Sequence, residues 1–188
     1  MNVIFLDFDG VIDTNYYRSY EQVEEKIKIL SDICHTYNCK IVIEASAKAA
    51  IDEETLEVDK DSVWVLKVFE LFKKYNIECI GRTPDVKKIK NEYSYLPMLK
   101  EDEIRLYLFR HPEIDHYCII DDDDLLDMRR KSDLDKVRKH LVKTEYYLAN
   151  NPEDEGLRFN HKEEVGRVLK LENDIKKYAL KKHNKNLY

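Results

Sequence analysis

The sequence predicts an α/β fold in which a central parallel sheet of about five strands is covered by helices on both faces. Two observations predict it. Short apolar runs alternate along the chain with longer stretches whose apolar residues recur about every 3.6 positions. Strands that alternate with helices in this way form βαβ units, which build a parallel sheet in a three-layer domain. The chain has 188 residues, which fits a single domain over 1–188.

The short apolar runs are the predicted strands. The first, Val3-Ile4-Phe5-Leu6, is apolar throughout, as expected for a strand buried on both faces. The predicted strands are Val3–Phe8, Lys40–Glu44, Ile77–Ile80, His116–Ile120 and His140–Val142.

The stretches between these strands carry apolar residues at helical spacing. In 21–37 the periodic residues are Val23, Ile27, Leu30, Ile33, Cys34 and Tyr37. In 62–75 they are Val63, Leu66, Phe69, Leu71, Phe72 and Tyr75. The predicted helices are 21–37, 62–75, 100–110, 133–139 and 160–182.

The composition narrows the class of protein. The net charge of −6 and the pI of about 5.6 give no overall basic signature for nucleic acid, although a local basic groove remains compatible with them. The mean hydropathy is −0.62, and no apolar run of about 18 residues suggests a membrane span. No signal peptide is recognisable, so we expect a cytoplasmic protein whose four cysteines are reduced.

The basic end of the chain has two interpretations. We expect the core to span about 2–169 and residues 170–188 to form a basic C-terminal helix or tail. Its lysines either contact a phosphate backbone or an acidic partner, or form the solvated face of a frayed helix. Three tyrosines also have more than one interpretation: they line a binding site, stack on a base, or pack a flap. They are Tyr16, Tyr17 and Tyr20.

Two carboxylates follow the first predicted strand, one residue apart. Because strand side chains alternate between faces, Asp7 and Asp9 are expected to project together from its carboxyl end, where ligands bind in open α/β sheets. Gly10 allows the backbone to turn sharply after them. Two like charges this close favour a cation, and oxygen-only ligands suit Mg²⁺.

Other strand ends carry matching chemistry. Ser46 and Lys48 follow the second strand, Lys100 precedes the helix that leads into the fourth, and the run Asp121–Asp124 ends the fourth. The carboxyl ends of parallel strands meet at one edge of a sheet, so these side chains can converge with Asp7. An apolar strand that ends in four aspartates favours metal binding over a solvated acidic turn.

This set of motifs resembles the haloacid dehalogenase (HAD) superfamily of aspartate-nucleophile phosphohydrolases, over about residues 2–169. The closest similarity is to capless HAD domains of the nucleic-acid-repair type. Ser46-Ala47-Lys48 resembles the S-x-R of polynucleotide 3′-phosphatases, and the segment Ile120 to Arg130 is similar there too. The ending H-L-V-K-T…G-L looks like a small HAD family linked to RNA repair proteins. The resemblance implies a three-layer Rossmann-like (HAD) fold with a minimal cap or none.

The resemblance also implies roles for the site residues. Asp7 would attack phosphorus, and Asp9 would act as general acid and then base. Mg²⁺ would be held by the Asp7 carboxylate, the Asp9 main-chain carbonyl and Asp121 or Asp122. The expected phosphate-binding residues are Ser46, Lys100, Gly10 and Lys48.

Three departures from the family pattern stand out. Glu44 and Ala45 precede Ser46 where small hydroxyl residues are usual, so we expect Glu44 to point away from the phosphate or to pair with Lys48. Lys48 replaces an arginine and loses its bidentate phosphate contact. The third motif of the family is represented here by a single lysine. We prefer Lys100 for this position, and Lys87, Lys88 and Lys90 are the alternatives.

The spacing between motifs predicts an open site. Only 37 positions separate Asp9 from Ser46, and 54 separate Ser46 from Lys100, which leaves no room for a large cap domain. The chain is therefore interpreted as a Mg²⁺-dependent phosphatase open to nucleic-acid ends. The alternatives are a phosphatase for nucleotides, small metabolites or phosphoprotein, and a catalytically weak metal-binding interaction module, which Glu44 would favour.

Overall fold

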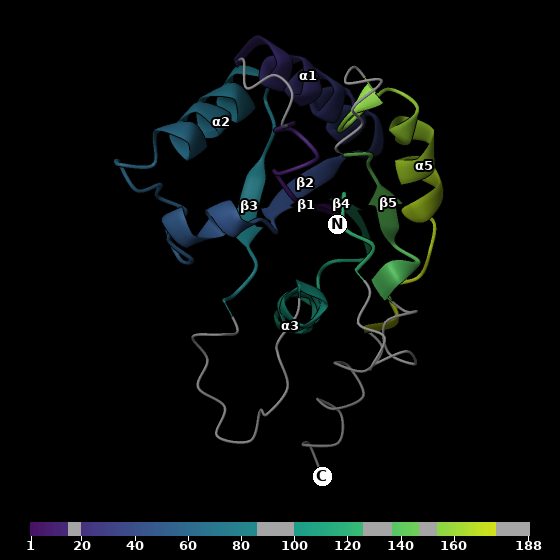
Figure 1. The fold of residues 1–188 in the computed structure, drawn as a ribbon. Helices are drawn as coiled ribbons and strands as arrows, with labels where there is room; N and C mark the ends of the chain where they lie inside the picture. Colours follow the sequence, from purple (N-terminus) through teal and green to yellow (C-terminus); the bar gives the residue numbers. More distant parts are fainter. Residues whose placement is uncertain (15–19, 86–99, 126–136, 147–153, 176–188) are drawn as a thin grey trace.

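The computed structural model describes residues 1–14, 20–85, 100–125, 137–146 and 154–175. It contains a five-stranded parallel sheet with the strand order β3-β2-β1-β4-β5 (Figure 1), which confirms the predicted fold class. The strands are β1 (Asn2–Leu6), β2 (Cys39–Ile43), β3 (Cys79–Arg82), β4 (His116–Asp121) and β5 (Leu141–Lys143).

Helices cover both faces of this sheet in the described part of the chain. Figure 1 shows α1, α2 and α5 on one face and α3 on the other. A short 3₁₀ helix, η1, follows β2 directly and was not anticipated from the sequence. The bounds are α1 (Tyr20–Tyr37), η1 (Ser46–Ala50), α2 (Val63–Lys74), α3 (Lys100–Arg110) and α5 (His161–Val168).

The alternation of side chains along β1 creates two hydrophobic cores. Ile4 and Leu6 belong to the larger core, under α1, α2 and α5. Val3 and Phe5 belong to the smaller one, under α3, where the Phe5 and Tyr107 rings meet edge to face at 5.7 Å. These four side chains of β1 are fully buried, as a central parallel strand requires.

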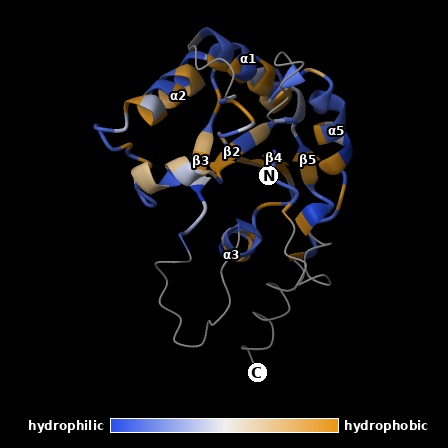
Figure 2. Cartoon of the chain, in the orientation of Figure 1, coloured by the Kyte–Doolittle hydropathy of each residue, from blue (hydrophilic) through white to orange (hydrophobic). Residues whose placement is uncertain are grey.

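Figure 2 shows the hydrophobic colour concentrated on the sheet, with hydrophilic residues on the outer sides of the helices. Within the described residues, no helix is both long and apolar enough to cross a membrane.

Two expected elements differ from the structure. The expected helix 160–182 is wrong as one continuous helix: α5 ends at Val168, and the chain then turns, with Leu171 N–H donating to Val168 O at 2.9 Å. Asn173 is buried beyond this turn and donates to Ile114 O at 3.0 Å, which holds the segment against the sheet. The expected helix 133–139 lies mostly outside the described residues, as do 176–188 of the basic tail.

Strand boundaries shift by one or two residues. The first strand ends at Leu6 rather than Phe8, because the N–H groups of Ile12 and Asp13 fold back onto Phe8 O at 3.0 and 2.9 Å. The third begins at Cys79 rather than Ile77, because Asn76 adopts a left-handed conformation (φ 54°) that ends α2.

The sheet register places the candidate site. Leu6 pairs with Ile43 on one side and Ile120 on the other, and Asp7 N–H continues the ladder by donating to Ile120 O at 3.1 Å. Asp7 is therefore beside Asp121, the last residue of β4. The strand order also reverses between β1 and β4, and ligands bind in open α/β sheets at the carboxyl ends beside such a switch point.

A close approach between β3 and α3 supplies a test of this packing. A Cβ at Gly81 would lie 3.0 Å from Tyr107 Cζ and closer still to its hydroxyl oxygen. We expect Gly81→Ala to destabilise the fold by about 1–3 kcal/mol through overpacking, measured by urea unfolding. Adding Tyr107→Phe should recover part of the loss. A Gly81→Ala protein as stable as wild type would contradict this packing.

Candidate active site

Asp7 lies at the carboxyl end of β1 and is almost fully buried. Its Oδ1 accepts a hydrogen bond from Phe8 N–H at 2.7 Å, and its Oδ2 accepts one from the Lys100 ammonium. Burial raises the pKa of the Asp7 carboxyl to about 7; Lys100 opposes this shift and the nearby Asp121 adds to it. The residue is a desolvated carboxylate held in one orientation, as a nucleophile requires.

Lys100 links the two central strand ends. Its ammonium, at the first residue of α3, contacts Asp7 and lies 2.7 Å from Asp121 Oδ2. Burial lowers the pKa of this lysine, but the attraction of Asp121 and Asp7 outweighs it and the pKa is raised overall. Lys100 is therefore a permanent cation between two carboxylates. Of the competing lysines, Lys87, Lys88 and Lys90 lie outside the described residues.

Asp7, Asp121 and Asp122 form the acidic cluster. One carboxylate oxygen from each lies within 4.8 Å of the others. Burial, followed by the charge of Asp121, raises the pKa of Asp122. Within the described residues, Lys100 is the ammonium that contacts this cluster, so three carboxylates share one cation there and offer only hard oxygen ligands. Both properties fit Mg²⁺.

Gly10 makes room for this cluster. It has a φ of 71°, which L residues rarely adopt, and a Cβ on it would lie 2.7 Å from Asp122 Cβ. Thr144 holds the same turn by donating to Gly10 O at 2.8 Å. The sequence placed Gly10 among the phosphate-binding residues; in the structure its missing side chain accommodates Asp122.

Asp9 takes a different partner from Asp7. The strand has ended at Leu6, so the alternation that was expected to aim both carboxylates together does not apply. The Asp9 side chain is exposed, lies outside the acidic cluster, and accepts a hydrogen bond from Ser46 Oγ at 3.3 Å. An exposed carboxyl can exchange protons with water, which suits a general acid and base.

Lys48 lies in a buried network rather than among phosphate-binding groups. Its ammonium is 3.3 Å from Glu44 Oε1 and 2.9 Å from Thr83 Oγ1, and it also contacts Glu103. Thr83 Oγ1 in turn donates to Glu44. The expected pairing of Glu44 with Lys48 is confirmed, whereas the ammonium expected on the phosphate is occupied by two carboxylates.

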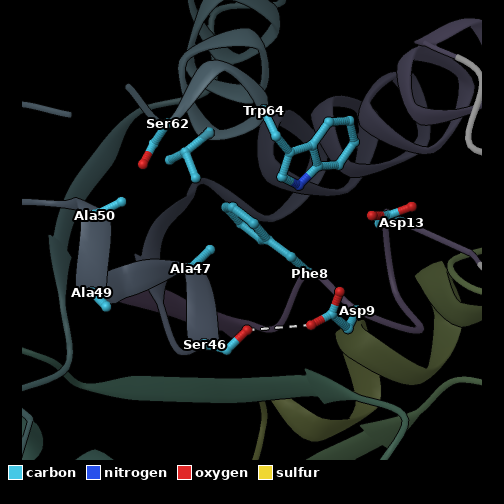
Figure 3. Close-up of a pocket in the computed structure, with 10 residues that line it drawn as sticks. Phe8, Asp9, Asp13, Ser46, Ala47, Ala49, Ala50, Ser62 and Trp64 are labelled. Atoms are coloured by element: carbon cyan, nitrogen blue, oxygen red, sulfur yellow. Dashed lines mark hydrogen bonds between the residues drawn. The ribbon is translucent and has the colours of Figure 1, made fainter. Parts of the chain in front are cut away.

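A cavity of about 570 Å³ opens beside Asp9 and Ser46. Figure 3 shows that Phe8, Asp13 and Trp64 also direct their side chains toward it. Reasoning from the sequence assigned no role to Trp64. The available signal was a single tryptophan at the start of the helix, next to the buried Val65. Tyr16 and Tyr17, and the side chain of Tyr20, lie outside the described part of the chain.

Residues 3–151 match one protein family, described as the HAD domain in Swiss Army Knife RNA repair proteins. The matched range covers most of the chain and contains Asp7, Ser46, Lys100 and Asp121. The matched range ends before Gly156-Leu157, which are the G-L of the H-L-V-K-T…G-L motif. No curated protein and no solved structure matches the chain.

The buried network predicts a pH-dependent stability. Burial raises the pKa of Glu44 from 4.5 to about 8, so the folded protein binds this proton more tightly than the unfolded chain. The free energy of unfolding should therefore fall as the pH rises between these values. We expect Glu44→Gln to make this fall smaller, leaving the part that the raised pKa of Asp7 contributes, measured by urea unfolding from about pH 5 to about pH 8.5.

Glu78→Gln is the matched control, because Glu78 is exposed and pairs with Lys40 on the surface. Its pH dependence should follow that of the wild type. The same slope in Glu44→Gln and wild type would show that Glu44 does not titrate in this range.

Proposed function

Since the chain belongs to the family of HAD domains found in Swiss Army Knife RNA repair proteins, we propose that it is a Mg²⁺-dependent phosphatase that hydrolyses phosphate monoesters at nucleic-acid ends. The observation that carries this proposal is the arrangement of Asp7, buried and held by Lys100, next to Asp121 and Asp122. A desolvated carboxylate that is held by a cation, beside an acidic cluster, suits the transfer of a phosphoryl group to that carboxylate.

The reaction has two displacement steps. An oxygen of Asp7 forms a bond to phosphorus while the ester bond breaks, and the leaving oxygen takes a proton from Asp9. Water then attacks the aspartyl-phosphate, Asp9 accepts its proton, and the bond between Asp7 and phosphorus breaks to release inorganic phosphate. The contrast between a buried Asp7 and an exposed Asp9 supports this division of roles.

The surrounding residues supply charge and position. Asp7, Asp121 and Asp122 would hold Mg²⁺, with the Asp9 main-chain carbonyl as a further ligand. The ion supplies positive charge that offsets the phosphoryl oxygens. Lys100 neutralises charge on the nucleophile side, and Ser46, within reach of Asp9, donates to a phosphoryl oxygen. We do not assign Lys48 to the phosphate, because its ammonium contacts Glu44 and Glu103.

The absence of a cap domain from the described residues between the motifs supports a large substrate. The 9–46 interval is occupied by α1 and β2, and the described part of 46–100 by η1, α2 and β3. A site that is open at this edge of the sheet admits the end of a nucleic-acid strand. It also admits nucleotides, small metabolites and phosphoprotein, so we propose comparing a 3′-phosphorylated oligonucleotide, a 5′-phosphorylated one, a 5′-nucleotide and a phosphotyrosine peptide.

The nucleophile assignment predicts that Asp7→Asn abolishes Mg²⁺-dependent hydrolysis of a 3′- or 5′-phosphorylated oligonucleotide and of an aryl phosphate, a loss of at least about 10³-fold in kcat. Phosphate release measures it. Asp32→Asn is the matched control, since Asp32 is exposed, pairs with Lys162 on the surface and lies outside the cluster. Equal activity in Asp7→Asn and wild type would refute the assignment. An inactive wild type that still binds Mg²⁺ would instead favour an interaction module.

The metal assignment predicts a direct effect on stability. An ion that binds only the folded chain raises its stability by about 2.7 kcal/mol at a hundred times its Kd, so Mg²⁺ should raise the Tm of the wild type. Asp121→Asn and Gly10→Ala should reduce this increase, the first by removing a ligand and the second by displacing Asp122. A Tm that responds equally to Mg²⁺ in all three proteins would place the ion elsewhere.

A further inference from the structure

The cavity beside Asp9 and Ser46 extends away from the acidic cluster toward the start of α2. Its volume of about 570 Å³ lies in the range of pockets that hold a nucleotide-sized ligand. In Figure 3 the Ser46–Asp9 hydrogen bond lies at one end and Trp64 at the other. A group attached to a phosphate at Ser46 would therefore enter this cavity directly.

Trp64 is the largest side chain of the cavity wall. It is half-buried, packs against the main hydrophobic core, and directs its indole ring into the cavity (Figure 3). The adjoining part of the wall comes from η1, where Ala47, Ala49 and Ala50 carry only methyl groups. Among the described residues that line the cavity, Phe8 supplies a second aromatic ring (Figure 3), and the three alanines leave room beside the indole for a flat ring.

We infer that this cavity is a base-stacking subsite, in which Trp64 stacks on the nucleobase of the terminal nucleotide whose phosphate is held by Ser46 and attacked by Asp7. The inference rests on the proposed function and specifies its substrate as a single-stranded end, because a base must leave its helical stack to reach an aromatic side chain. The polar side chains of Ser62 and Asp13 at the cavity rim can contact base edges.

Stacking of this kind tolerates any base, since every base has a π face. The subsite should therefore favour nucleotide-bearing phosphates over simple ones with little preference among bases. A phosphotyrosine ring would enter the same cavity, and preferential binding of a phosphotyrosine peptide is the outcome that would overturn the inference in favour of a protein substrate.

The kinetic test compares two single-stranded oligonucleotides that differ only in whether the phosphorylated terminal nucleotide carries a base. Trp64→Ala should lower kcat/KM on the base-bearing strand by roughly 5- to 100-fold and leave the abasic strand unchanged. Trp64→Phe should retain part of the preference. Phe159→Ala is the control, since Phe159 is 70% exposed and lies outside the cavity. Equal losses on both strands would mean that Trp64 is structural only.

A binding test needs no turnover. Trp64 is the single tryptophan of the chain, so the intrinsic fluorescence reports on this ring alone. In the Asp7→Asn protein, a nucleoside monophosphate and a short oligonucleotide should quench it, whereas inorganic phosphate and an abasic strand should not. Quenching by the mononucleotide alone would identify a free nucleotide as the occupant and overturn the strand-end inference.

The two tests separate the inference from the proposed function. Quenching by a strand end, together with a wild type that hydrolyses no phosphate ester, supports the subsite and refutes the phosphatase. Hydrolysis of both strands at equal rates without quenching supports the phosphatase and refutes the subsite.

Discussion

The contact of the Lys100 ammonium with Asp7 and Asp121 is the interaction on which the rest of the site depends. The parallel register brings the carboxylates of β1 and β4 together at a buried edge, where like charges repel strongly and solvation is poor. The two carboxylates can lie this close together because the Lys100 ammonium between them offsets their charge. Lys100 is the first residue of α3, so the position of this helix under the sheet decides whether the two carboxylates have a cation between them.

The same helix also supports the neighbouring strand end. Glu103, one turn after Lys100, contacts Lys48, which bonds Glu44 and Thr83 beyond β2 and β3. Helix α3 thus contributes a cation to the carboxylates of β1 and β4 and an anion to the lysine after β2. Tyr107 packs against Phe5 and Gly81 beneath both groups. The ion pairs and the smaller hydrophobic core therefore orient the same element.

The turns that follow β1 and β2 divide the chemistry of the site between two environments. Asp7 is enclosed and faces the acidic cluster, whereas Asp9 is exposed and faces Ser46 and the cavity with Trp64. The turn at Gly10, which follows both carboxylates, admits Asp122 beside them. In the proposed reaction, the enclosed Asp7 is the nucleophile and the exposed Asp9 is the general acid and base.

The sequence by itself determined the order of the elements and the polar residues at the strand ends, because periodicity and turn residues are local properties of the chain. Convergence of Asp7, Lys100 and Asp121 also followed, since parallel strands end at one edge. Only the tertiary structure decided the partners. Lys100 meets Asp7 across 93 positions, Lys48 is held by Glu44 and Glu103, and helix 160–182 stops at Val168. Such pairings depend on register and burial between distant segments, which local patterns do not encode.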